Sequence, residues 1–189
     1  MSLIELVPGK LWEYEDFLTS EEILAILDPV CALEDDEWYE EDLPEYDRHH
    51  AGRTYEISRL PGGYGLAASI NIKVAELFKN VDSIVQVGSV VRGTDKITPS
   101  GMHRDNEDGQ YEEENRNATV KYGVLMYLNE DFDGGEICYP ELGIEYKPKP
   151  GVLLIHDAGN MHGVNSISNG TRYSMTSFVY GLEAEVRKI

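Results

Sequence analysis

The chain has 189 residues, enough for one domain with a full hydrophobic core and too few for two ordinary domains. Its 41% hydrophobic and 27% charged residues indicate a folded globular protein and exclude a disordered chain. Because 16 basic and 35 acidic residues give a net charge of −19, the surface repels phosphate backbones, and we expect no nucleic acid partner.

The N-terminal residues and the number of cysteines indicate the cellular compartment of the protein. Residues 1–5 carry no basic region and no long apolar stretch, so we expect no cleaved signal peptide. No apolar run approaches the roughly 20 residues that cross a bilayer, so we expect no membrane partner. Cys31 and Cys138 are too few for a disulfide framework or a zinc cluster. We expect free thiols in a reducing compartment and predict a cytoplasmic protein.

Two helices are predicted in the first half of the chain. Thr19-Ser20-Glu21-Glu22 is typical of a capping box, and an apolar helix face follows it, formed by Ile23, Ile26, Leu27 and Val30. Asp28-Pro29 is expected to end this helix. The dense acidic run over 34–48 predicts a solvated loop. A second helix is predicted over 66–79, with one apolar side formed by Ala67, Ile70, Val74, Leu77 and Phe78.

From residue 84 the chain consists of short runs rich in Val, Ile, Tyr and Thr, separated by turn residues. The predicted strands are 84–91, 99–105, 118–128, 135–140, 143–147, 151–156, 161–166 and 171–180. This close spacing predicts an α+β, mainly β fold, in which N-terminal helices pack outside a double-stranded β-helix (jelly roll). We expect a single domain over 1–189, with a helical part at about 1–82 and a jelly-roll core at about 83–181.

The first candidate site residues are His103 and Asp105, in Met102-His103-Arg104-Asp105. Side chains two residues apart on a strand project from the same face, so the two would lie together. An imidazole beside a carboxylate supplies two ligands of a facial iron site, although an isolated His-x-Asp pair is more often structural.

Two further candidates lie near the C-terminus. His162 follows the turn-like Ala158-Gly159-Asn160-Met161. A histidine at this place either faces a cavity at the rim of a sheet or is an ordinary capping or surface residue. Arg172 shares one face of a predicted strand with Ser174 and Thr176. A buried arginine there needs an anionic partner, and its planar fork suits a carboxylate. The alternative is an exposed edge strand with Arg172 in water.

Together, His103, Asp105, His162 and Arg172 resemble the pattern of the 2-oxoglutarate/iron(II) dioxygenases, specifically the prolyl 4-hydroxylase-like branch. The resemblance covers roughly 84–180. The connecting sequence is also similar to the family's central hairpin and the turn before its seventh core strand, in Tyr127-Leu128-Asn129, Gly134-Gly135-Glu136, Tyr139-Pro140-Glu141 and Lys147-Pro148-Lys149-Pro150-Gly151.

The resemblance implies that His103, Asp105 and His162 are catalytic metal ligands for Fe(II), and that Arg172 binds 2-oxoglutarate. It implies O2 as the second co-substrate and allows for L-ascorbate as a further cofactor. Tyr127 and Thr176 would lie in the co-substrate pocket, with core packing and an ordinary strand threonine as the alternatives. The carboxylate of Asp105 favours hydroxylation over halogenation, because related halogenases have a small residue there. His156 is expected to be structural rather than a ligand.

The resemblance favours a prolyl 4-hydroxylase that acts on a peptide or protein substrate. The acidic stretches 34–47 and 107–114 would attract a basic peptide. Three alternatives remain: a hydroxylase of a free amino acid or other small molecule, a non-enzymatic cupin-like metal-binding module, and a degenerate scaffold. The sequence does not indicate the oligomeric state.

Overall fold

The computed structural model describes residues 2–38, 53–96, 101–106, 120–147 and 149–187. Its α-helices are α1 (Ser20–Cys31) and α2 (Gly63–Glu76), and short 3₁₀ helices occupy Asp35–Glu37, Ile57–Arg59 and Pro140–Leu142. The strands are β1 (Ser2–Val7), β2 (Leu11–Glu15), β3 (Arg53–Glu56), β4 (Phe78–Lys79), β5 (Ser83–Ile84), β6 (Ser89–Gly93), β7 (Val120–Tyr127), β8 (Asp133–Gly134), β9 (Ile137–Tyr139), β10 (Ile144–Tyr146), β11 (Leu153–Asp157), β12 (Gly163–Val164), β13 (Ile167–Asn169), β14 (Arg172–Tyr180) and β15 (Glu185–Val186).

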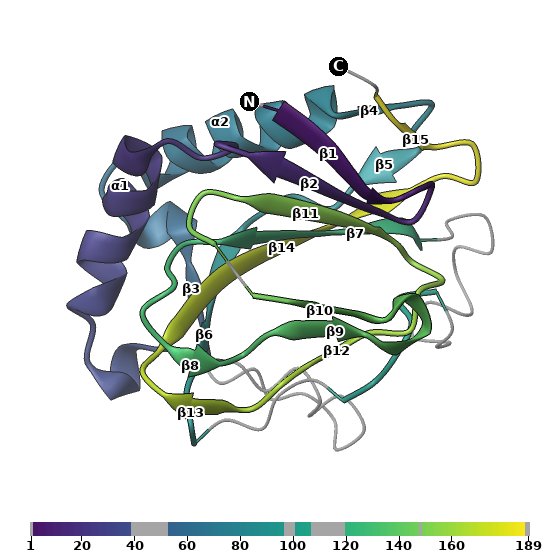
Figure 1. Ribbon diagram of the computed structural model, residues 1–189. Helices are drawn as coiled ribbons and strands as arrows, with labels where there is room; N and C mark the ends of the chain where they lie inside the picture. The colour runs from purple at the N-terminus through teal and green to yellow at the C-terminus, as the bar shows by residue number, and fades with distance from the viewer. Residues whose placement is uncertain (1, 39–52, 97–100, 107–119, 148, 188–189) are drawn as a thin grey trace, which may run out of the picture.

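The largest sheet has the strand order β1-β2-β11-β7-β14-β6-β3, with β5 pairing to β14, and each of its pairs is antiparallel. A smaller sheet, β10-β9-β12, and the pair β13-β8 face it from the other side, while both helices lie against its outer face (Figure 1). The predicted jelly roll with helices packed on the outside is thereby confirmed.

The outer core lies between the helices and the large sheet. The capping box at Thr19 and Glu22 starts α1 as predicted, and Ile26 and Val30 of this helix are buried against the sheet. The predicted apolar side of the second helix is confirmed for Ala67, Ile70 and Val74, which belong to or pack against this core. The helix ends at Glu76 rather than at 79, so Leu77 caps it and Phe78 begins β4, and both side chains still lie in the core. These contacts hold the large sheet rigidly from behind.

The inner core lies between the two facing sheets. It consists of Leu11, Tyr127, Ile137, Tyr139, Tyr146, Val152 and Leu154. Strand β11 contributes to both cores, which explains its nearly continuous apolar sequence: Leu153 and Ile155 belong to the outer core, whereas Leu154 faces inward. His156, next on the inward face, is 1% exposed. The inward face of β11 therefore leads from apolar packing to a buried polar group.

The structure corrects three further predictions. The N-terminal part contains a hairpin, β1–β2, which joins the large sheet through β11, so this part is not only helical. The helix predicted to end at Asp28-Pro29 continues to Cys31 with Pro29 in its last turn. The described residues 101–105 of the predicted strand 99–105 form only an isolated bridge between His103 and His162, and the Asp105 N–H donates instead to the carbonyl of the turn residue Ala158.

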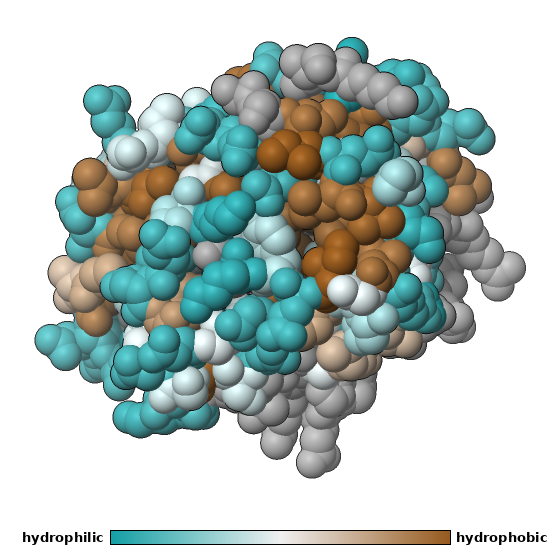
Figure 2. Space-filling model, viewed as in Figure 1, coloured by the Kyte–Doolittle hydropathy of each residue, from teal (hydrophilic) through white to brown (hydrophobic). Residues whose placement is uncertain are grey.

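The surface shows hydrophilic and hydrophobic residues interspersed in the view of Figure 2. Among the described residues the large exposed hydrophobic side chains are Ile4, Leu24, Tyr64, Ile72, Val85, Met102 and Leu182. Cys31 and Cys138 are both free, as predicted. In the described part of the chain no helix combines the length and apolar character needed to span a membrane. Most of the acidic stretches 34–47 and 107–114 lies outside the described residues.

Candidate metal centre and co-substrate site

The segment that carries His103 and Asp105 is fixed to the turn before His162. His103 and His162 exchange two backbone hydrogen bonds of 2.9 Å, and the Asp105 N–H donates to the carbonyl of Ala158 at 3.0 Å. Arg104, between the two candidate ligands, donates to the carbonyl of Gly159 and forms a two-pronged pair with Glu141. Residues that lie far apart in the sequence are therefore held together by main-chain bonds.

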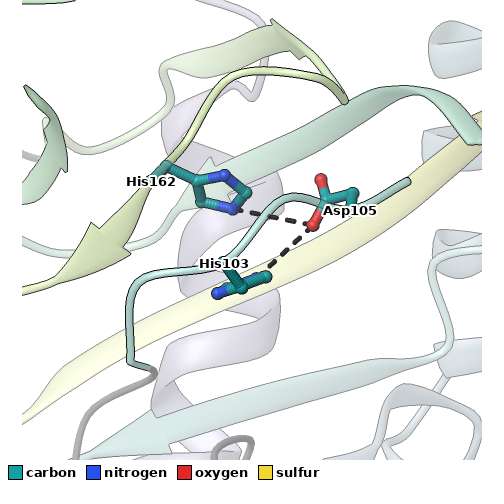
Figure 3. Close-up of side chains that lie close together, drawn as sticks. All are labelled: His103, Asp105 and His162. Atoms are coloured by element: carbon teal, nitrogen blue, oxygen red, sulfur yellow. Dashed lines mark ion pairs between the residues drawn. The ribbon is translucent and has the colours of Figure 1, made fainter. Parts of the chain in front are cut away.

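Three side chains converge at this point. The Nε2 atoms of His103 and His162 lie 3.5 Å and 3.6 Å from Oδ1 of Asp105. Figure 3 shows both imidazoles turned toward this carboxylate. One possible ligand atom from each residue lies within 4.8 Å of the other two, and among the described residues no other such group of His, Cys, Asp and Glu is found. The three residues predicted from the sequence thus meet in space.

Hydrogen bonds determine which nitrogen of each imidazole carries the proton. Nδ1 of His103 lies 2.8 Å from the carbonyl of Gly101, and Nδ1 of His162 lies 3.0 Å from that of Asn160. A carbonyl oxygen only accepts, so both Nδ1 atoms carry hydrogen, and in the neutral rings both Nε2 atoms present lone pairs. Two lone pairs and a carboxylate oxygen then face one another, an arrangement that a cation stabilises.

Burial and neighbouring charges keep two of the three side chains, His162 and Asp105, in the protonation state that a metal requires. Burial lowers the pKa of His162 to about 4, with a further contribution from His156, so its ring is neutral near pH 7. Burial alone would raise the pKa of Asp105, but interactions with His103, His156 and His162 outweigh it and hold the pKa well below the usual range. Asp105 is therefore ionised. His103 remains partly exposed, so the cluster is open on one side.

A second hydrogen-bonded group lies behind Asp105. Nε2 of His156 is 2.7 Å from Oδ2 of Asp105, and its Nδ1 is 3.0 Å from the hydroxyl of Tyr139. A Cβ at Gly123 would lie 2.3 Å from Nε2 of His156 and 2.6 Å from Oδ2 of Asp105. The sequence predicted a structural His156, placed Tyr139 only in the family's hairpin and gave Gly123 no role in the site. The glycine inside an apolar strand was a signal of such a close approach.

Arg172 is a cation whose predicted anionic partner is not supplied by the described residues. Its Nη1 donates to the carbonyl of Gly135 at 3.2 Å, while its buried Nε has no hydrogen-bond partner there. Burial lowers its pKa, opposed by Tyr127. Gly93 lies directly opposite on β6, and a Cβ there would lie 3.6 Å from both Nε and Nη2. A carboxylate would satisfy these donors.

The predicted pocket residues lie on adjacent strands. Tyr127 is opposite Ser174, two residues from Arg172 on the same face, and burial raises the pKa of Tyr127 to about 12, against the charge of Arg172. Its hydroxyl therefore stays protonated at neutral pH. Thr176 is exposed although Met175 and Ser177 are buried, so solvent reaches this face of β14. That Tyr127 and Thr176 contact a co-substrate stays a prediction.

This donor set suits a particular pair of ligands. Two imidazole nitrogens and one carboxylate oxygen, with an open side, form the two-histidine, one-carboxylate set that non-haem Fe(II) oxygenases use. An arginine whose buried Nε has no hydrogen-bond partner in the described part of the chain, near a protonated tyrosine, suits the carboxylate of an organic acid. The residues present thus fit both iron and 2-oxoglutarate.

Comparison with known proteins agrees with this chemistry. Residues 95–180 match the model of the 2OG-Fe(II) oxygenase superfamily, a stretch that contains all six predicted site residues. Prolyl 3-hydroxylase 2 of mouse is 38% identical over 58 residues, which are 27% of this chain and 8% of that protein. The chain therefore corresponds to less than a tenth of that relative.

Solved structures share the fold over 93% of this chain. A prolyl hydroxylase from Trichoplax adhaerens, in complex with a hypoxia inducible factor peptide fragment, has a TM-score of 0.70 at 16% identity, with 86% of it covered. A viral collagen prolyl hydroxylase from Paramecium bursaria Chlorella virus-1, solved with 2OG, has a TM-score of 0.65 at 14% sequence identity, and 98% of that chain is covered. A Pseudomonas putida prolyl-4-hydroxylase has a TM-score of 0.61 at 13% sequence identity, and 95% of that chain is covered. On this evidence residues 95–180 match the 2OG-Fe(II) oxygenase superfamily, and the chain as a whole has the fold of prolyl hydroxylases.

Proposed function

We propose that the protein is an Fe(II)- and 2-oxoglutarate-dependent dioxygenase that hydroxylates a prolyl residue of a peptide or protein. The observation that carries the proposal is the convergence of one possible ligand atom each from His103, Asp105 and His162, in a chain that also holds an arginine whose buried Nε has no hydrogen-bond partner among the described residues. Either feature has structural explanations alone. Their occurrence in one superfamily domain favours the enzyme over a metal-binding module or a scaffold.

Each residue has a defined role in this proposal. His103, Asp105 and His162 would hold Fe(II), and the hydrogen bonds from Nδ1 to Gly101 and Asn160 fix both rings so that Nε2 faces the metal. Arg172 would bind the far carboxylate of 2-oxoglutarate, with Tyr127 and Thr176 as further hydroxyl donors. The inner core, which includes Tyr139 and Leu154, excludes water from one side of the site.

When bound, iron and 2-oxoglutarate supply the chemistry: one atom of O2 enters succinate as carbon dioxide leaves, and the other enters a substrate C–H bond. The protein holds the reactants and leaves an open side for the substrate beside the partly exposed His103. L-Ascorbate is proposed as an additional cofactor that preserves activity over many turnovers.

Names of similar proteins support the choice of substrate. The Trichoplax neighbour is described with a bound peptide, and the Pseudomonas neighbour is a prolyl-4-hydroxylase, which favours carbon 4 of proline. The mouse relative is a prolyl 3-hydroxylase, so carbon 3 is the competing position. With a net charge of −19, the protein should prefer a basic or neutral peptide.

The test is product analysis. The full chain is incubated with Fe(II), 2-oxoglutarate, ascorbate and a panel of proline-containing peptides, and succinate is measured together with the mass of each peptide. We expect a gain of one oxygen on proline, at carbon 4 by amino-acid analysis, and no product from His162→Ala. If only free amino acids were hydroxylated, the proposed substrate would be a small molecule and not a peptide. Metal binding without any succinate would overturn the proposal.

A further inference from the structure

Behind the candidate ligand Asp105, the side chains of Tyr139 and His156 form a hydrogen-bonded chain that ends on its carboxylate, and these hydrogen bonds have no role in the proposal above. His156 is 1% exposed and Tyr139 is fully buried in the inner core. Two ring-nitrogen contacts of 2.7 Å and 3.0 Å are within ordinary hydrogen-bond range. His156 therefore has both nitrogens engaged and cannot bind a metal without breaking one of these bonds.

The direction of these hydrogen bonds follows from the groups involved. The ionised carboxylate of Asp105 only accepts, so Nε2 of His156 must carry the hydrogen. In the neutral ring Nδ1 is then an acceptor, and the hydroxyl of Tyr139 must donate to it. Burial raises the pKa of Tyr139 well above its usual range, which keeps that hydroxyl protonated. The tyrosine thereby fixes the tautomer of the histidine.

The two oxygens of Asp105 consequently face different partners. Oδ2 accepts from His156, whereas Oδ1 faces the Nε2 atoms of His103 and His162. Gly123 makes this arrangement possible, because a Cβ at that position would overlap both His156 and Oδ2. The register places Gly123 and His156 directly opposite each other on β7 and β11.

We propose that His156 is a positioning residue that, held by Tyr139, occupies one oxygen of Asp105 and leaves the other as the single carboxylate ligand of the metal. This inference rests on the proposed function. The bond prevents the carboxylate from rotating so as to present both oxygens to the ion. It also keeps a coordination position open that a two-oxygen carboxylate would fill.

The test uses Co(II) as the probe, with the full chain and no substrate. Loss of an outer hydrogen-bond partner typically weakens metal binding by about 10- to 100-fold. We therefore expect Co(II) affinity to fall about that much in His156→Phe, together with a change in the visible absorption of bound Co(II). His156→Gln, whose amide N–H can still reach Asp105, should recover most of the affinity and the wild-type spectrum.

If His156→Phe does not fold, Tyr139→Phe still tests the inference, because this substitution removes only one oxygen atom and should leave the fold intact. It should weaken Co(II) binding by less than His156→Phe does. Tyr146→Phe is the matched control, because Tyr146 is buried in the same core but its hydroxyl interacts with Glu13 rather than with His156. It should bind Co(II) as wild type does.

Two results would overturn the inference. If Co(II) affinity and the Co(II) spectrum were unchanged in both His156→Phe and Tyr139→Phe, these two residues would have only a structural role. Complete loss of binding in His156→Gln, equal to that of His162→Ala, would make His156 a ligand instead. Failure of the wild type to bind Co(II) would instead remove the metal site itself, and with it the proposed function.

Discussion

Replacing Arg172 with glutamine should separate binding of 2-oxoglutarate from binding of the metal. In the free protein Arg172 donates to one carbonyl, and its buried Nε has no hydrogen-bond partner within the described ranges. Its charge therefore contributes little to folding, and its removal should leave the melting temperature unchanged or higher. Removing one partner of a buried charge pair costs about 2 to 5 kcal/mol of binding. That corresponds to a roughly 30-fold to 4,000-fold higher Kd for 2-oxoglutarate.

Isothermal titration of the anaerobic metal-loaded protein measures this Kd, and titration of the metal alone provides the second readout. Arg92→Gln is the matched control. Arg92 also has a buried unpaired Nε, but it pairs with Asp35 at 2.9 Å and lies over the ring of Trp38. It should lower stability and leave the Kd for 2-oxoglutarate unchanged. An unchanged Kd in Arg172→Gln, or equal losses in both variants, would refute the reasoning.

Three further predictions follow from the site and the charge. Gly123→Ala should lower the melting temperature, since overpacking costs about 1–3 kcal/mol, and weaken Co(II) binding; a variant that matches wild type in both would contradict the close approach of His156 and Asp105. The folded-state pKa of His162 is about 4, below the ordinary 6.5, so the unfolded chain binds more protons and the metal-free protein should lose stability as pH falls from about 6.5 to 4. Thermal melts across this range, with His162→Gln as control, check the sign, and stability that rises on acidification would contradict it. Finally, KM for a basic prolyl peptide should rise with salt while that for a neutral one stays constant; equal salt responses would remove the electrostatic argument.

Local sequence signals predicted the elements that form locally. The Thr19 capping box and the apolar faces of both helices were readable because their spacing reflects helix geometry directly. Alternation in β14 was readable for the same reason: Met175 and Ser177 are buried on the side away from Ser174 and Thr176, as period two requires. The residue types and order of His103, Asp105, His162 and Arg172 indicated the chemistry through resemblance to a family.

Features that depend on pairing between distant segments were missed. The hairpin β1–β2 has a turn signal in Pro8-Gly9, but its place beside β11 is a long-range contact. His103 and Asp105 share a site because the chain bonds to Ala158 and His162, rather than because they alternate on a regular strand. The role of His156 depends on its register opposite Gly123, which no local pattern encodes.

The most direct test of the central claim is an anaerobic titration of the full chain with Fe(II) in the presence of 2-oxoglutarate, followed by the weak visible charge-transfer band. We predict a band that saturates at one Fe(II) per chain and is absent in His103→Ala and His162→Ala. A wild-type protein that develops no band, or a band that persists in both variants, would contradict the claim that these residues hold one ferrous ion.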